Sequence, residues 1–183
     1  MEFLLLSGIS FFAFCNIAVF YGFYSYLGQI GIPVEWRGLL VGLEPFTAFV
    51  LRLLLIPLIS VANATRVLLV GLLLLVMTLL SYQWALSVPS LIPLRILHGA
   101  TFVLLVSASI TLVVQLIPEE RSAQGFSLFS LSTLLPYALM PPLAEWLLPY
   151  VTSAAQIYAG VSLLAIPAIL LLLVGGRRLA AVV

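Results

Sequence analysis

The sequence lacks lysine and aspartate altogether, so its charged side chains are seven arginines and six glutamates. The formal net charge is +1, which is far below the basic excess of nucleic-acid-binding proteins, and we expect no nucleic-acid partner. The single cysteine, Cys15, cannot form a disulfide within the chain, and its apolar surroundings are typical of a small buried residue. The composition therefore excludes a basic nucleic-acid surface and an internal disulfide.

Sequence motifs of common enzymes are also missing. The chain contains no G-x-x-x-x-G-K-[ST], H-E-x-x-H, C-x-x-C or G-x-S-x-G pattern, and its one histidine, His98, has no aspartate partner. We therefore predict no catalytic residue, no metal ligand and no cofactor, and a protein that is not an enzyme. An intramembrane serine hydrolase would need a Ser–His pair. Because serines are plentiful, an intramembrane hydrolase is a third interpretation, after the two non-enzymatic interpretations given below.

Long apolar runs dominate what is present. Hydrophobic residues make up 64% of the 183 residues, and the mean hydropathy is +1.30. Runs of about 18 or more apolar residues are long enough to cross a bilayer as helices. We predict an all-α integral membrane protein, a single domain over 1–183, with six spans at 3–27, 38–59, 66–86, 91–114, 124–147 and 155–175. The loops are too short for a soluble domain, so any function must lie in the helices or at their ends.

Two signals indicate the orientation of the spans. Four arginines follow the second, fourth and sixth spans, whereas only Arg37 lies at the opposite ends; the four are Arg66, Arg121, Arg177 and Arg178. Aromatic residues gather at the opposite ends: Tyr26, Trp36, Trp84, Trp146, Tyr150 and Tyr158. The positive-inside rule and the interfacial preference of aromatic rings agree on cytoplasmic termini. We expect a multi-pass protein of a bacterial inner membrane.

Small residues and prolines indicate where helices pack or bend. Gly38 and Gly42 form a GxxxG pattern that predicts close approach of another helix. The fifth span contains Pro136, Pro141 and Pro142, which should bend its outer half because proline cannot donate a backbone hydrogen bond.

Five ionisable side chains fall inside the spans: Glu44, Arg52, Arg95, His98 and Glu145. An arginine at the centre of a membrane helix costs about 2.5–3.5 kcal/mol on insertion scales, so each of these groups should face protein or a water-filled cavity. At 1.5 Å per residue, Glu44, Arg95 and His98 lie at similar depth. We predict that these three form a polar cluster that binds solute or exchanges a proton, because histidine ordinarily titrates near neutrality. The alternative is a static ion pair that locks two helices together.

The remaining polar residues of the spans have simpler interpretations. Arg52 lies near the cytoplasmic end of its helix, so its side chain is expected to extend to the interface. Glu145 is close enough to the outer surface to be solvated. Asn16, Tyr21 and Tyr24 of the first span either line a cavity or bond a neighbouring helix.

Three stretches resemble the major facilitator superfamily. "LIPLRILHGATF" (91–102) is similar to the family's fourth-helix motif, in which glycine follows arginine by four residues. "IPEERSAQGF" is similar to its helix 4–5 connection, and "EWRGLLVGLEPFTAFVLRLLLIPLISVANATRVLLVGLLL" to its second and third helices. Two features depart from the family: the 2–3 loop "PLISVANATR" keeps only Arg66 of the usual pattern, and Met140-Pro141 replaces the Gly-Pro of the antiporter signature.

The resemblance covers one six-helix half of a twelve-helix fold and implies two inverted three-helix repeats. It places Asn16, Tyr21, Tyr24, Arg95 and His98 on a cavity wall, since the first and fourth helices line the cavity in that family. It also turns the second and fifth spans toward the other half, and it places Arg66 and Arg121 at the cytoplasmic loops that act as a gate.

The resemblance implies a secondary transporter, or half of one, that moves a small solute by alternating access, with proton coupling or down its gradient. The alternative is a non-transporting six-helix interaction or assembly subunit derived from a transporter. The expected partners are the lipid bilayer, a small solute, protons and a second six-helix half, which belongs to the same longer chain, to a second copy or to a separate chain. The sequence sets neither the solute nor the direction of transport.

Overall fold

The computed structural model describes residues 1–181, and this part of the chain is built of helices without a strand. The helices are α1 Glu2–Ala18, α2 Phe23–Gln29, α3 Val34–Leu55, α4 Val61–Ser81, α5 Val88–Leu116, α6 Ser122–Leu147, α7 Ala154–Ser162 and α8 Ala165–Ala181. They form six segments that are long and apolar enough to cross a membrane: 2–29, 34–58, 61–81, 88–116, 119–150 and 154–179. The predicted all-α membrane fold with six spans is confirmed.

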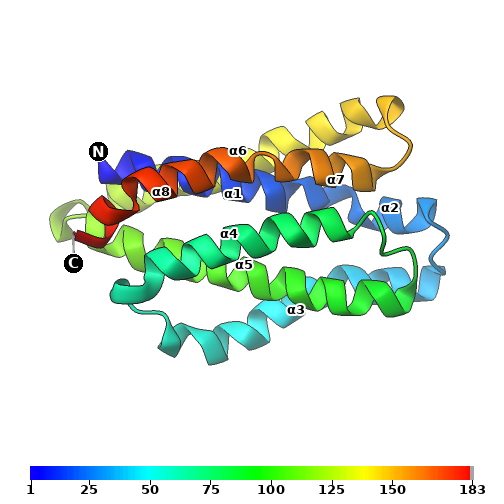
Figure 1. Ribbon diagram of the computed structural model, residues 1–183, viewed down its shortest axis with the longest axis horizontal. Helices are drawn as coiled ribbons and strands as arrows, with labels where there is room; N and C mark the ends of the chain where they lie inside the picture. Colours follow the sequence, from blue (N-terminus) through cyan, green and yellow to red (C-terminus); the bar gives the residue numbers. More distant parts are fainter. Residues whose placement is uncertain (182–183) are drawn as a thin grey trace.

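The six segments lie side by side along one long axis, and both termini are at the same end (Figure 1). α5 packs most extensively against α3 and α4, and α1 packs against α6 and α8. The two central helices, α1 and α5, also contact each other, so α3 and α6 lie on opposite flanks of the bundle.

Two of the spans are interrupted between two α-helices, and the missing N–H of a proline explains one of the interruptions. The first span changes to a 3₁₀ turn at Val19–Gly22 between α1 and α2. The sixth breaks between α7 and α8, where Pro167 offers no N–H to the carbonyl of Leu163 four residues earlier. A short 3₁₀ stretch inside a helix is a frequent mark of a hinge.

The third span begins earlier than the sequence pattern predicts. The predicted span is 66–86, but α4 begins at Val61 because Ser60 and Asn63 form a capping box, in which each side chain binds the other's backbone N–H. Arg66 is therefore an exposed residue in the second turn of α4 and not a loop residue, and Trp84 lies in the turn after the helix. Hydropathy does not register capping, which is why the prediction was shifted.

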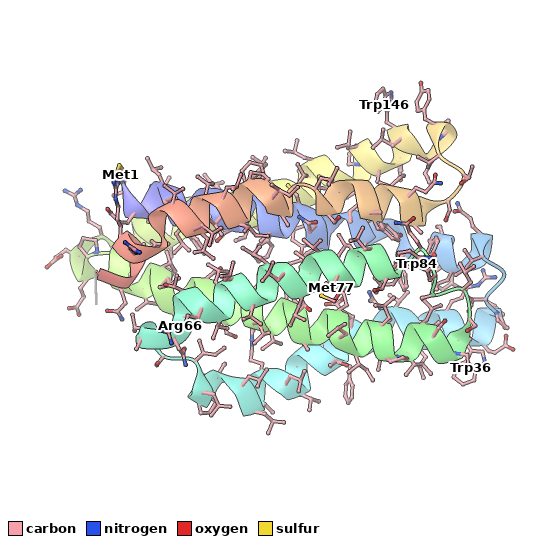
Figure 2. The ribbon with its side chains drawn as sticks, in the orientation of Figure 1. Met1, Trp36, Arg66, Met77, Trp84 and Trp146 are labelled. Atoms are coloured by element: carbon pink, nitrogen blue, oxygen red, sulfur yellow. The ribbon has the colours of Figure 1, made fainter. Side chains whose placement is uncertain are left out.

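The two ends of the bundle differ in composition (Figure 2). All three tryptophans, Trp36, Trp84 and Trp146, lie at one end, and Met1 and Arg66 lie at the other. Amphipathic aromatic rings prefer the membrane interface. The arrangement separates the residues that the sequence assigned to the two membrane faces.

Gly99 of α5 lies close against the backbone of α3. A Cβ atom at this position would lie 2.5 Å from the carbonyl oxygen of Glu44 and 2.9 Å from Cβ of Thr47. The predicted contact at Gly38 and Gly42 is absent among the described residues, since a Cβ at either position would meet no atom within 4 Å. Gly99 therefore allows the close contact between α3 and α5 that the sequence pattern assigned to Gly38 and Gly42.

We expect Gly99→Ala to lower the stability of the bundle by about 1–3 kcal/mol, because an added methyl group must push α3 and α5 apart. Thermal unfolding of the detergent-solubilised protein measures this loss. Gly42→Ala is the matched control and should not lower the melting temperature, because its methyl group enters open space and alanine is the better helix former. Equal melting temperatures for the two variants would contradict the packing described here.

Candidate functional site

Pro45 leaves an unpaired backbone acceptor in the middle of α3. Proline has no N–H, so the carbonyl of Val41, four residues earlier, loses its helical donor, and the proline ring crowds that carbonyl. The guanidinium of Arg95 takes the place of the missing donor. Its Nη2 donates to the carbonyl oxygen of Val41 at 3.0 Å, and its Nε donates to that of Leu40 at 2.9 Å. A charged side chain of α5 thus completes the hydrogen bonding of a broken turn in α3.

The other contacts of Arg95 link it to three polar side chains. Nη2 lies 3.4 Å from Oε2 of Glu44, which forms an ion pair across the two helices. Nη1 donates to the hydroxyl of Tyr82 at 3.4 Å and lies 3.4 Å from Nδ1 of His98. Because a guanidinium can only donate, Nδ1 of His98 is the acceptor in that contact. The structure brings Glu44, Arg95 and His98 together at one depth, as their positions in the sequence predicted.

Aromatic rings of the first span, of the turn after α4 and of α7 cover this polar cluster. The guanidinium carbon of Arg95 lies 4.4 Å from the ring centroid of Phe23, within cation–π range. Phe20 packs edge-on against His98 at 4.6 Å between centroids and stacks on Tyr158 at 4.1 Å. We call these rings the aromatic cluster: Phe20, Phe23, Tyr26, Tyr82 and Tyr158.

Burial by the aromatic cluster corrects one expectation from the sequence. Arg95 and His98 are only 3% and 1% exposed, and neither lines the cavity that Glu44 borders. The arginine is tolerated in the membrane because backbone carbonyls, Glu44 and an aromatic face satisfy it, not because its helix faces water in this conformation. Glu44 is the member of the polar cluster that reaches the cavity.

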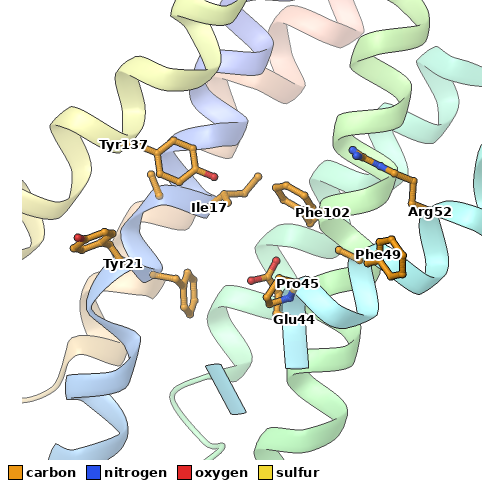
Figure 3. Close-up of a pocket in the computed structure, with 11 residues that line it drawn as sticks. Ile17, Tyr21, Glu44, Pro45, Phe49, Arg52, Phe102 and Tyr137 are labelled. Carbon is orange, nitrogen blue, oxygen red and sulfur yellow. The ribbon is translucent and has the colours of Figure 1, made fainter. Parts of the chain in front are cut away.

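The cavity has a volume of about 440 Å³ and lies between the two flanking helices (Figure 3). Four spans contribute to its wall: Ile17, Ala18, Phe20 and Tyr21 of the first; Glu44, Pro45, Ala48, Phe49 and Arg52 of α3; Phe102 of α5; and Tyr137 of α6. Its size falls in the range of small-molecule sites, about 300–1,000 Å³, which combine mostly apolar walls with a few polar groups.

Polar groups approach this cavity from two sides. In Figure 3 the carboxylate of Glu44 and the guanidinium of Arg52 extend from α3, and the hydroxyl of Tyr137 extends from α6 toward them. Arg52 is partly buried and contributes to the cavity wall, a position that the sequence did not predict. Pro45 and Arg52 are seven residues apart in α3, which is close to two helical turns, so they lie on the same face of this helix.

The three candidate residues of the first span have different environments. Tyr21 is 80% exposed and lines the cavity. Tyr24 lies outside it, with its ring 5.9 Å from the guanidinium carbon of Arg37. Asn16 is fully buried; its Nδ2 donates to the carbonyl oxygen of Phe12 at 2.8 Å, and its Oδ1 has no partner among the described residues. Of the three, only Tyr21 contributes to the cavity wall.

The charged candidate residues near the ends of the spans are exposed. Arg121 lies in the 3₁₀ turn Glu119–Arg121 before α6, and both it and Arg66 are exposed. Glu145 is exposed near the tryptophan end of α6, as predicted. Among residues 1–181 no group of three or more His, Cys, Asp or Glu side chains is placed to hold a metal ion.

Sequence reasoning missed several residues of the site. Pro45 could have been found, because a proline next to a membrane-embedded glutamate exposes a carbonyl that needs a donor. Tyr82 and Tyr137 give no such signal, since their neighbours in the sequence do not indicate which residues of other helices they contact.

Comparison with known proteins identifies the class. The model of the Major Facilitator Superfamily matches residues 6–181, nearly the whole chain. The chain belongs to this family of membrane transporters and is an integral multi-pass membrane protein. No curated protein and no solved structure matches the chain.

We expect Arg95→Met to destabilise the protein less when Pro45→Ala is also present. Alanine supplies an N–H to the carbonyl of Val41, so the loss of Arg95 then leaves one fewer buried acceptor unpaired. A double-mutant cycle by denaturant unfolding should give a coupling of about 0.5–3 kcal/mol. The same cycle with Pro141→Ala, a proline of α6 remote from Arg95, should be additive. Additivity in both cycles would contradict the role assigned to Pro45.

Proposed function

We propose that the chain is one half of a secondary transporter and that a small solute crosses the membrane through the cavity between α1, α3, α5 and α6. The observation that carries this proposal is a cavity of about 440 Å³ in a family member, with a membrane-embedded carboxylate, Glu44, in its wall. Ionisable groups inside a membrane are costly and mark solute and ion pathways. The polar cluster fixes that carboxylate between a guanidinium and the open space.

A second six-helix half is required to complete the path in this proposal. The second and fifth spans bury the smallest share of their residues, and large apolar side chains remain open on both flanks of the cavity. Phe46, Phe49 and Leu53 of α3 are each at least 64% exposed, and Leu131 and Leu134 of α6 at least 61%. The second half belongs to a longer form of this chain, to a second copy or to a separate polypeptide, and the termini face the cytoplasm.

Proton coupling in this proposal runs through Glu44. Its carboxylate borders both the cavity and Arg95, so it can exchange a proton with cavity water while its charge acts on the guanidinium at 3.4 Å. Protonation removes the ion pair, and Arg95 then keeps only the α3 carbonyls, Tyr82 and His98. The protonation state of Glu44 is thereby linked to the strength of the contact between α3 and α5. His98 has no route to the cavity in this conformation and serves as a structural acceptor.

Alternating access can be tested without knowing the solute. We expect Phe49→Cys and Tyr21→Cys, both in a Cys15→Ser background, to react with a membrane-impermeant maleimide from either face of native membrane vesicles. Both positions line the cavity, and the path must open to each side in turn. Leu75→Cys is the control and should stay unlabelled, because Leu75 is fully buried. Labelling from one face only would support the non-transporting subunit instead.

We expect Glu44→Gln to abolish proton-driven solute accumulation while leaving solute exchange intact, because glutamine keeps the shape but cannot release a proton. His98→Asn should retain both activities. The assay measures uptake into reconstituted vesicles under an imposed pH gradient, for whichever of a panel of radiolabelled organic acids, amines and sugars the wild type accumulates. Accumulation by Glu44→Gln, or its loss in His98→Asn, would contradict the assignment.

A further inference from the structure

Arg52 is a cation in the cavity wall without a protein partner. Among the residues that the structure describes, no carboxylate lies within ion-pairing distance of its guanidinium and no hydrogen bond to it is formed. Arg37 donates to the carbonyl of Ile32 at 2.7 Å, and Arg95 binds α3 and Glu44, whereas Arg66 and Arg121 are exposed near the ends of the spans. Arg52 is also partly buried, so water solvates it incompletely.

The charge balance of the cavity is positive. Glu44 is the acidic residue of the wall, and Arg95 already neutralises it from behind. The pair leaves the charge of Arg52 uncompensated, and the two charged groups of α3 lie eight residues apart, which corresponds to about 12 Å along a helix. Glu44 is paired with Arg95 and not with Arg52, so its carboxylate leaves the guanidinium of Arg52 available to a bound anion.

The surface between Arg52 and Glu44 is aromatic. Phe49 lies on α3 beside Arg52, Phe102 faces it from α5, and Tyr137 of α6 lies on the opposite side. Phe20 of the first span also lines the cavity. Such rings bind a flat or bulky apolar body, while a small number of polar groups fix its orientation. The wall thus offers one cationic end and an apolar interior.

We infer that the solute is an amphipathic organic anion whose acid group binds Arg52 and whose apolar body lies against Phe49, Phe102 and Tyr137. This inference rests on the proposed function, since it names the solute of the same cavity. A cationic solute would have to displace Arg95 from Glu44, and a neutral solute would leave Arg52 without a counter-charge. Arginine also matches carboxylate, sulfonate and phosphate groups with two parallel hydrogen bonds.

Arg52 also lines a smaller cavity toward the end of α3, together with Ile56 and Ser107. An anionic lipid headgroup could supply the same chemistry from that side. The two sources differ in where the apolar part lies: a solute places it among the aromatic rings of the large cavity, and a lipid places it in the bilayer. A test must therefore separate a free anion from a membrane lipid.

The test uses three probes of nearly identical shape: 2-naphthoate, the neutral 2-naphthamide and the cationic 2-naphthamidine. Equilibrium binding of each is measured on the purified protein in bilayer discs of neutral lipid, and again with phosphatidylglycerol added. The variants are Arg52→Gln, Arg52→Lys and Phe102→Ala, with Arg177→Gln as a control that removes one positive charge outside the cavity.

We expect naphthoate to bind at least about tenfold more tightly than the other two probes, and this preference to vanish in Arg52→Gln, because a hydrogen bond to a charged group contributes about 1.5–3 kcal/mol. Arg52→Lys should keep the preference in part, Phe102→Ala should weaken all three probes, and Arg177→Gln should change nothing. Phosphatidylglycerol should not displace naphthoate.

Three results would overturn the inference. Tighter binding of naphthamidine would indicate a cationic solute, and equal or absent binding of all probes would show that Arg52 selects no anion. Displacement of naphthoate by phosphatidylglycerol would assign Arg52 to a lipid headgroup. Flux of the same probes into vesicles is measured separately, so a failure of transport with anion binding intact would contradict the proposed function and not the anion site.

Discussion

The structure depends on how one buried guanidinium is satisfied inside a membrane. Arg95 replaces the N–H that Pro45 cannot supply. The unpaired carbonyl of α3 thereby gains a donor and the guanidinium of α5 gains acceptors, so neither polar group is left unsatisfied inside the membrane. The contact needs the backbones to be close, and Gly99, one turn along α5, lets the carbonyl of Glu44 approach. A proline, an arginine and a glycine on two helices thus form one interlocking unit.

This unit divides the interior into a sealed side and an open side. Toward α4 and α7 the aromatic cluster covers Arg95 and His98, and toward α6 the cavity exposes Glu44 and Arg52. Glu44 lies at the boundary, since it touches the sealed arginine and the open space at once. A change of charge in the cavity therefore reaches the helix–helix contact through a single ion pair, which is the physical basis of the proposed coupling.

The sequence predicted the elements that periodicity and composition encode, and it failed where partners come from distant segments. Six spans and the meeting of Glu44, Arg95 and His98 follow from apolar run length and helical rise. The start of α4 was displaced because the Ser60–Asn63 capping box has no hydropathy signal. A single sequence does not show which helices pack against each other. It therefore could not predict that Gly38 and Gly42 face open space or that Arg52 lines the cavity.

The most direct test of the account is a solid-state NMR measurement of the dipolar coupling between ¹⁵N in the Arg95 guanidinium and ¹³C in the Val41 carbonyl, in lipid bilayers. The account predicts a measurable coupling, because Nη2 of Arg95 lies 3.0 Å from the carbonyl oxygen of Val41, and the labelled carbon is bonded to that oxygen at about 1.23 Å. In Pro45→Ala the coupling should weaken, since the helix then supplies its own donor. A wild-type coupling too weak for a hydrogen-bonded pair, whose donor and acceptor lie within about 3.2 Å, would contradict the account.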